Sequence, residues 1–327
     1  MKLLRSLVLA AVLCVGGACA AKPTLLDYLD LYKLLENKEF SQLDARYAMA
    51  AGLEADASGV SGSDLFFLGM QAGIGRRDDV ARAAAALKLA RQWVASAPRS
   101  VPAAIVMGRI IVRDAPRIAD WTEQGRLIAE ALKALEAVKE SNAQKDPAWT
   151  STYARLISLD GATPSQVIEL TRNQLAGMSE PGEWFFEEIV GALELKSTEA
   201  LPELRELATL AVHRSDKARG TSMLAVIYTS AFDALPALRS NPFKAGMPDW
   251  QTMDRAYTDL NKLRPDRVIQ IHQAALACKA QDKNRTAELL DLLPAPSSMD
   301  QLTWAPWGGD VFRSRCEEWV RGDSMPA

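Results

Sequence analysis

The chain has 327 residues and a formal charge of −3, from 38 Lys and Arg against 41 Asp and Glu. Acidic and basic residues alternate along it without forming a strongly basic face, which argues against nucleic acid as a partner because phosphate binding needs clustered cations. Alanine, leucine and charged residues dominate, and alternating β-branched runs are nearly absent, so the composition predicts an all-helical protein.

The first twenty residues have the pattern of a secretory signal peptide. They combine a positive start, a short apolar core and small residues around a cleavage point, at Lys2 and Arg5, at 7–15, and at Ala18, Cys19 and Ala20. Cleavage after Ala20 would make Ala21 the mature N-terminus and leave a charge of −5. The alternative is a lipidated Cys19, which would anchor the protein to a membrane.

The expected organisation is a signal peptide at 1–20 followed by one helical domain at 21–327. No other apolar run reaches the roughly eighteen residues that a spanning helix needs, so we expect no membrane span in the mature protein. The signal peptide predicts that the mature protein is periplasmic or secreted.

The segment from Asp78 to Ala115 shows the helical pattern most clearly. A break between two helices is predicted at Pro98 and Pro102, because proline cannot donate to the helix ladder. The apolar face of the first helix is expected to consist of Ala83, Leu87, Ala90, Val94 and Ala97. Later helices are predicted at 120–141, 147–159, 163–176, 184–195, 199–213, 217–233, 250–263, 267–281, 284–293 and 310–321.

Helix pairs are predicted to begin near residues 24, 63, 101, 147, 183 and 217. The intervals, roughly 34 to 46 residues, are those of stacked α-hairpin repeats. The residues that resemble tetratricopeptide signatures are Leu68, Gly69, Ala84, Leu87 and Pro98, then Met107, Gly108, Asp146 and Pro147, and the segment 279–294. Segments 91–112 and 312–320 also resemble a family of bacterial tetratricopeptide-like (TPR-like) proteins known only as a domain of unknown function. The resemblance implies an all-α fold of stacked antiparallel helical hairpins that form an α-solenoid.

Two cysteines, Cys278 and Cys316, remain after the signal peptide. Each lies on the apolar stripe of a predicted helix, so both sulfurs should point inward. An even pair in an exported protein predicts a disulfide, which would close a loop of about 38 residues. Two buried free thiols are the alternative; a metal pair would lack further ligands.

Catalytic and cofactor motifs are absent. The sequence has no His-Glu-x-x-His, Cys-x-x-Cys or Gly-x-Ser-x-Gly pattern and no phosphate-binding loop. Its two histidines exclude a His-rich metal centre. Structural roles are expected for His213, at a predicted helix end, and for His272, on a half-buried face. We therefore predict no enzymatic activity, no cofactor and no metal site.

Two weak patterns could bind ligands. Residues 73–77, Gly-Ile-Gly-Arg-Arg, offer amides and guanidinium groups to an anion, although a turn that ends a helix also accounts for them. Glu187 and Glu188 follow three aromatic residues at 184–186, as in some sugar sites. Adjacent helical residues point about 100° apart, however, which favours an aromatic core face with a solvated acidic edge.

Two further candidates are a long loop and a tryptophan pair. The proline-rich loop at 235–249 offers Arg239, Phe243 and Lys244, and long loops in compact domains are often functional. A simple bridging role is the alternative. Trp304 and Trp307 could form a flat surface for a ligand. Aromatic packing that caps the last repeat is the competing explanation.

The leading interpretation is an exported, TPR-like module that binds another envelope protein through a concave helical surface. One alternative is a periplasmic immunity protein that neutralises a delivered toxin. The other is a hydrolase acting on carbohydrate or cell wall through Glu187, Glu188 or Asp249.

Overall fold

The computed structural model describes residues 24–53, 60–75, 79–141, 143–178, 181–195, 198–293 and 298–322. Within these ranges every regular element is a helix, which confirms the predicted all-α class. The signal segment with Cys19, Ala20 and Ala21 lies outside the described residues, and so do Arg76 and Arg77. None of the helices in the described ranges has both the length and the apolar character that a bilayer crossing requires.

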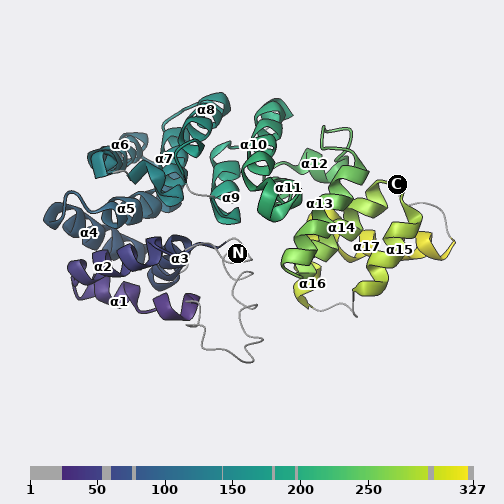
Figure 1. Ribbon diagram of the computed structural model, residues 1–327, viewed down its shortest axis with the longest axis horizontal. Coiled ribbons are helices and arrows are strands. Elements are labelled where there is room, and N and C mark those ends of the chain that lie inside the picture. The colour runs from purple at the N-terminus through teal and green to yellow at the C-terminus, as the bar shows by residue number, and fades with distance from the viewer. Residues whose placement is uncertain are drawn as a thin grey trace.

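The N-terminal helices pack against one another ahead of the more regular part of the fold (Figure 1). They are η1 (Leu25–Tyr28), α1 (Leu31–Glu36), α2 (Phe40–Ala51), α3 (Gly62–Ile74) and α4 (Val80–Ser96). Ser61 caps α3: its Oγ accepts from the backbone N of Asp64 at 3.1 Å, and the Asp64 carboxylate accepts from the backbone N of Ser61 at 3.0 Å. This reciprocal pair satisfies donors that the start of a helix leaves open.

The buried face of α4 is rotated from the predicted one. Its fully buried residues are Ala83, Ala86, Ala90 and Trp93. Leu87 and Val94 are only partly buried. The Trp93 ring stacks on Phe40 with centroids 6.0 Å apart. Apolar spacing alone did not reveal this rotation, because alanine fits either face and the large indole decides which one turns inward.

The middle of the protein forms two rows of helices. Its elements are α5 (Val101–Asp114), η2 (Ala115–Arg117), α6 (Trp121–Ala137), η3 (Lys139–Ser141), η4 (Ala143–Lys145), α7 (Pro147–Leu159), α8 (Pro164–Leu175), α9 (Glu183–Ala192), η5 (Thr198–Ala200), α10 (Leu201–Arg219), α11 (Ser222–Ala234) and α12 (Pro236–Ser240). Along what we call the inner row, α5, α7, α9 and α11 contact one another in succession, and α13 (Trp250–Leu263) follows. The outer row consists of α6, α8 and α10, each packed against inner-row helices. Figure 1 shows the helices following an arc, with the outer row on its outer side.

Helix starts in this region follow the sequence closely. Asp146 and Thr163 cap α7 and α8, and each precedes a proline, which is preorganised for the first helical position. The end of α10 differs from the prediction, because the helix continues past His213 to Arg219. Gly220, with φ of +56°, follows that end, and a left-handed conformation favours glycine.

The C-terminal part contains α13, α14 (Arg267–Lys279), α15 (Lys283–Leu292), α16 (Ser298–Trp304), η6 (Ala305–Trp307) and α17 (Gly309–Arg321). The sequence did not predict α16 or the short helix η6. Gly308, with φ of +118°, makes the turn into α17.

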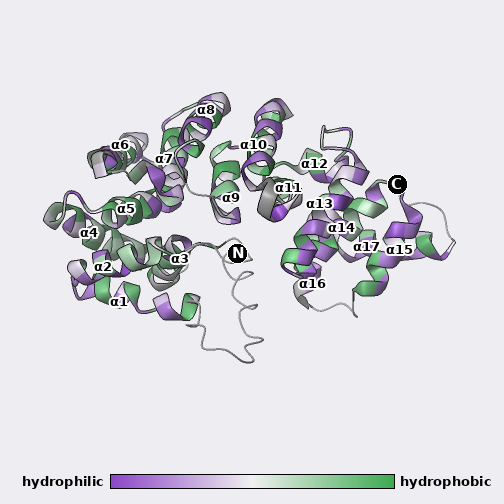
Figure 2. Ribbon diagram, in the orientation of Figure 1, coloured by the Kyte–Doolittle hydropathy of each residue, from purple (hydrophilic) through white to green (hydrophobic). Residues whose placement is uncertain are grey.

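Buried apolar side chains form two clusters that meet at α7. One extends from Tyr28 to Leu156, and the other from Ala154 to Trp319. Between them α7 buries Thr150, Ser151 and Thr152, so polar side chains are part of the junction. Figure 2 shows apolar and polar stretches on the same helices, as expected for amphipathic elements.

Candidate functional site

Arg109 of α5 lies between two aromatic rings. Its guanidinium carbon is 4.2 Å from the centroid of the Trp184 ring on α9 and 5.0 Å from that of the Phe67 ring on α3. Arg109 and Trp184 are partly exposed, whereas Phe67 is fully buried. A cation over an aromatic face is attracted by the ring, and more strongly where water is excluded. One side chain therefore links three helices.

The contact between Arg109 and Trp184 crosses α7. This helix lies between α5 and α9 in the inner row, and α6 and α8 pack against it from the outer row. Arg109 and Trp184 therefore join α5 and α9, the two inner-row neighbours of α7. A Cβ atom on Gly108 would lie only 2.7 Å from the Cγ2 atom of Thr152. The close approach of α5 to α7 thus depends on a residue without a side chain.

Three carboxylates act electrostatically on Arg109. They belong to Glu188 on α9, Asp64 on α3 and Asp146 at the start of α7. Burial lowers the pKa of the Arg109 guanidinium, because desolvation disfavours its charged form. The carboxylates oppose this shift, and Glu188 opposes it most strongly.

Asp64 and Asp146 are already bound by other donors. Asp64 accepts from the backbone and the hydroxyl of Ser61, and burial raises the pKa of Asp64 to about 6. Asp146 accepts the hydroxyl of Tyr47 and, at 2.7 Å, the backbone N of Ala148. Burial also raises the pKa of Asp146. Both carboxylates thus already accept hydrogen bonds from groups other than Arg109.

Arg109 forms no hydrogen bond or ion pair with any residue that the structure describes, and its Nε atom is buried. Two more polar atoms on the neighbouring helix α7 are buried without a partner among the described residues: Oγ1 of Thr152 and Nε of Arg155. Thr152 is 3% exposed. Arg155 donates through Nη1 to the carbonyl oxygen of Gly191 on α9. Arg109 therefore combines an unpartnered donor with a partly exposed indole beside it.

This arrangement favours the binding of a hydrogen-bond acceptor. Guanidinium groups present planar pairs of donors, and a threonine hydroxyl can also donate. Within the described ranges, no group of His, Cys, Asp and Glu side chains could hold a metal ion.

No family model, curated protein or solved structure matches this protein. The geometry of the inner row is consequently the evidence from which a function is inferred. That geometry rests on Arg109, which sequence reasoning did not identify. The signal was present, because Arg109 interrupts a run in which residues 102–108, 110 and 111 are all buried. Periodicity alone could not show that its partners would come from α3 and α9.

Trp184 and Glu188 were part of the predicted aromatic and acidic pattern, and the structure places both beside Arg109. Glu187 is exposed on the same helix. Asp249 caps α13 by accepting from the backbone N of Thr252 at 3.0 Å. Of the carboxylates considered for a hydrolase, Glu188 thus acts on Arg109 through its charge, and Asp249 caps a helix.

The structure does not show the flat ligand surface considered for Trp304 and Trp307; both rings pack inward, in line with the aromatic packing that was the competing explanation. Their exposed fractions are 1% and 5%. The Trp307 indole donates from Nε1 to Nδ1 of His272 at 3.0 Å and packs edge-on against Phe232. Both rings turn inward because α16 and η6 fold this segment against the core. His272 consequently has the structural role that the sequence predicted.

The candidate loop at 235–249 is docked against the helices around it. Its first part forms α12, which contains a partly buried Arg239 and contacts η6. Phe243 packs against the larger apolar cluster, while Lys244 is exposed. Arg205 of α10 donates from Nε to the carbonyl oxygen of Gly246 at 3.0 Å. The structure brings this loop to the Trp307 segment, not to Arg109.

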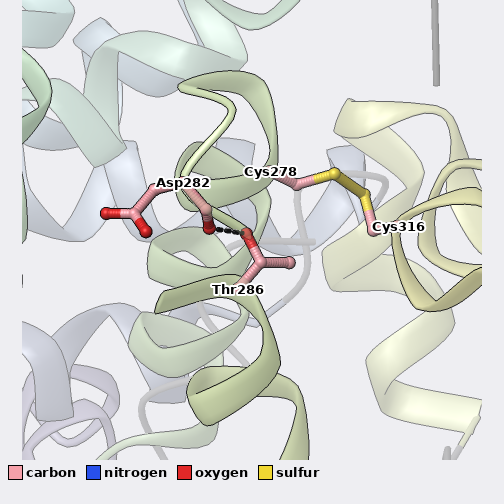
Figure 3. Close-up of a disulfide and its surroundings, with 4 residues drawn as sticks. All are labelled: Cys278, Asp282, Thr286 and Cys316. Atoms are coloured by element: carbon pink, nitrogen blue, oxygen red, sulfur yellow. Dashed lines mark hydrogen bonds between the residues drawn. A yellow bond between two sulfur atoms is a disulfide. The ribbon is translucent and has the colours of Figure 1, made fainter. Parts of the chain in front are cut away.

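The structure joins Cys278 and Cys316, as predicted (Figure 3). Their Cα atoms are 6.1 Å apart, and the bond ties the end of α14 to α17. In the following turn, Thr286 donates to the backbone carbonyl of Asp282 at 2.7 Å. The disulfide therefore restrains the last described helix against α14.

Proposed function

We propose that this protein is an exported, TPR-like stack of antiparallel helical hairpins that binds another envelope protein along its inner row. The succession α5, α7, α9, α11 and α13 supports this interpretation, because stacked hairpins expose one continuous side of such a row. Export is inferred from the signal-like segment at 1–20 and agrees with the disulfide, since oxidising compartments permit that bond.

The observation that carries the proposal is the contact of Arg109 with Trp184. Both residues are partly exposed, and they join α5 to α9, the two inner-row neighbours of α7. Tryptophan and arginine are enriched among the residues that dominate binding energy at protein interfaces. A rigid, stacked pair of this kind has already lost much of the side-chain freedom that binding would otherwise remove.

Site-specific photo-crosslinking tests this proposal. A photoreactive residue replaces Glu187, which is exposed on α9 of the inner row, or Glu169, which is exposed on α8 of the outer row. In envelope preparations we expect a discrete protein adduct from position 187 that is lost when Trp184→Ala is added. Adducts of equal yield from both positions, or none from position 187, would contradict binding along the inner row.

A further inference from the structure

The Arg109 guanidinium is an unusual cation in this protein because its charge is stabilised without an acceptor among the described residues. Elsewhere Arg91 forms a two-pronged pair with Glu130, with both N to O distances at 2.7 Å. Arg109 instead has aromatic rings on Trp184 and Phe67 and no hydrogen bond to a described residue. The rings attract the charge but cannot accept in-plane hydrogen bonds. The rings therefore hold the planar guanidinium group in place, and its N–H groups have no acceptor among the described residues.

The carboxylates whose charges act on Arg109 do not accept hydrogen bonds from its guanidinium group. Asp64 is bound to the cap of α3, and Asp146 accepts from the Tyr47 hydroxyl. Glu188 is the strongest opposite charge, yet it forms no ion pair with Arg109. Nε of Arg109 is buried without an acceptor among the described residues, and an incoming acceptor would satisfy it.

Two polar atoms on the neighbouring helix α7 also lack a partner among the described residues. Thr152 is 3% exposed and has no partner for Oγ1 among the described residues. Arg155, one turn further along α7, has a buried Nε that likewise finds no acceptor there. The carbonyl oxygen of Gly191 accepts from Nη1 of that arginine. The unpartnered groups on Arg109, Thr152 and Arg155 can each donate a hydrogen bond.

We propose that Arg109 binds a carboxylate of the partner protein as a two-pronged pair, with the Trp184 ring keeping the guanidinium plane in position. Planar carboxylate recognition is the interaction for which arginine is best shaped. The carboxylate belongs either to an aspartate or glutamate side chain or to the C-terminus of the partner. This inference rests on the protein-binding function proposed above and specifies its chemistry.

Small model ligands test the inference without the partner. N-acetylglutamate α-amide presents the carboxylate of a side chain, N-acetylalanine presents a C-terminal carboxylate, and N-acetylglutamine α-amide is the neutral control. Binding is followed by the indole N–H resonance of Trp184, assigned with Trp184→Phe. We expect a saturable shift with one of the two acids and none with the neutral control. Equal shifts with the neutral control, or no shift with either acid, would overturn the inference.

Variants separate the role of Arg109 from general folding effects. Arg109→Gln should abolish the shift, while Arg113→Gln on the same helix should preserve it, because Arg113 is already paired with Asp114 at 2.8 Å. If Arg109→Gln fails to fold, the affinity for the carboxylate is measured in Glu188→Gln instead. Removing this competing charge should tighten carboxylate binding roughly three- to tenfold. Unchanged affinity in Glu188→Gln would contradict the inference.

The outcomes also distinguish this inference from the proposed function. An adduct at position 187 that persists although neither acid binds would leave protein binding intact and refute only the carboxylate site. Carboxylate binding without any inner-row adduct would refute the protein partner and retain Arg109 as a receptor for small acids.

Discussion

Tyr47 of α2 donates its hydroxyl to Asp146, which lies 99 residues further along the sequence and caps α7. The same tyrosine ring packs edge-on against Phe66, with centroids 5.5 Å apart. An N-terminal helix is thereby joined to the helix at which the two apolar clusters meet. Asp146 is also one of the three carboxylates whose charge acts on Arg109.

Tyr47→Phe should therefore destabilise the protein. It removes one donor from a carboxylate that is largely desolvated, and such a loss costs roughly 1–3 kcal/mol. Urea unfolding measures the change. Trp121→Phe is the control, because Trp121 is 83% exposed and its replacement should change the free energy of unfolding by less than about 0.5 kcal/mol. Equal stability of Tyr47→Phe and wild type would show that the hydrogen bond does not support the fold.

Gly108→Ala should lower the stability, although alanine is normally the better helix former. Its Cβ would lie 2.7 Å from the Cγ2 atom of Thr152, and overpacking of this kind costs roughly 1–3 kcal/mol. Gly125→Ala in α6 is the matched control, since no atom lies within 4 Å of a Cβ there. It should stabilise by up to about 1 kcal/mol.

Thermal unfolding of the double variant Gly108→Ala/Thr152→Ser identifies the cause. Serine lacks the methyl group that Gly108→Ala would meet, so the second change should restore part of the lost stability. A double variant whose losses are simply additive would contradict the proposed contact between α5 and α7.

Acidification should stabilise the native state through Asp64. Its pKa is raised to about 6 in the folded protein, above the ordinary value of 3.8, so the folded state binds the proton first as the pH falls. The contribution of Asp64 to stability is therefore greatest below about pH 4 and is lost as the pH rises through 6. Two pH units correspond to about 3 kcal/mol at most.

Asp64→Asn isolates this contribution from those of other carboxylates. The asparagine oxygen can still accept from Ser61 at the cap of α3. Denaturant unfolding at pH 7 and pH 4.5 should show that wild type gains stability relative to the variant on acidification. A difference between the two proteins that does not change with pH would contradict the raised pKa of Asp64.

Loss of the disulfide should loosen the C-terminal end first. Reduction or Cys316→Ser releases a loop of 38 residues, and the loop-entropy model gives about 4 kcal/mol for its closure. The helix α17 is the last described one, and terminal elements fray earlier than central ones. Hydrogen exchange should therefore accelerate in α17 before it does in α3 or α5. Two free thiols titrating in the native, non-reduced protein would refute the bond.

Local signals in the sequence predicted much of the helical part of the fold. The proline after Asp146 and the Thr-Pro start at Thr163 placed α7 and α8 within a residue or two. The inward stripes of two helices also predicted the pairing of Cys278 with Cys316. These features depend on neighbours within one or two helical turns, and such neighbours are visible in a sequence.

The misplaced features depend on tertiary contacts. The polar stretch after His213 has no apolar period, yet it remains helical up to Gly220. Trp307 was considered for a ligand surface, but His272 provides its buried hydrogen-bond partner. The candidate site was missed for the same reason, because the ring that covers Arg109 lies on a helix two positions further along the inner row. No local pattern encodes that approach.

The central claim is that a protein partner binds across the inner row at Arg109 and Trp184. Hydrogen exchange of the purified protein, with and without the partner captured at position 187, tests it most directly. We predict slower exchange in α5, α7 and α9 of the complex, with the effect reduced by Trp184→Ala and retained in Trp121→Ala. Protection confined to α6, α8 and α10, or protection that Trp184→Ala leaves unchanged, would contradict the claim.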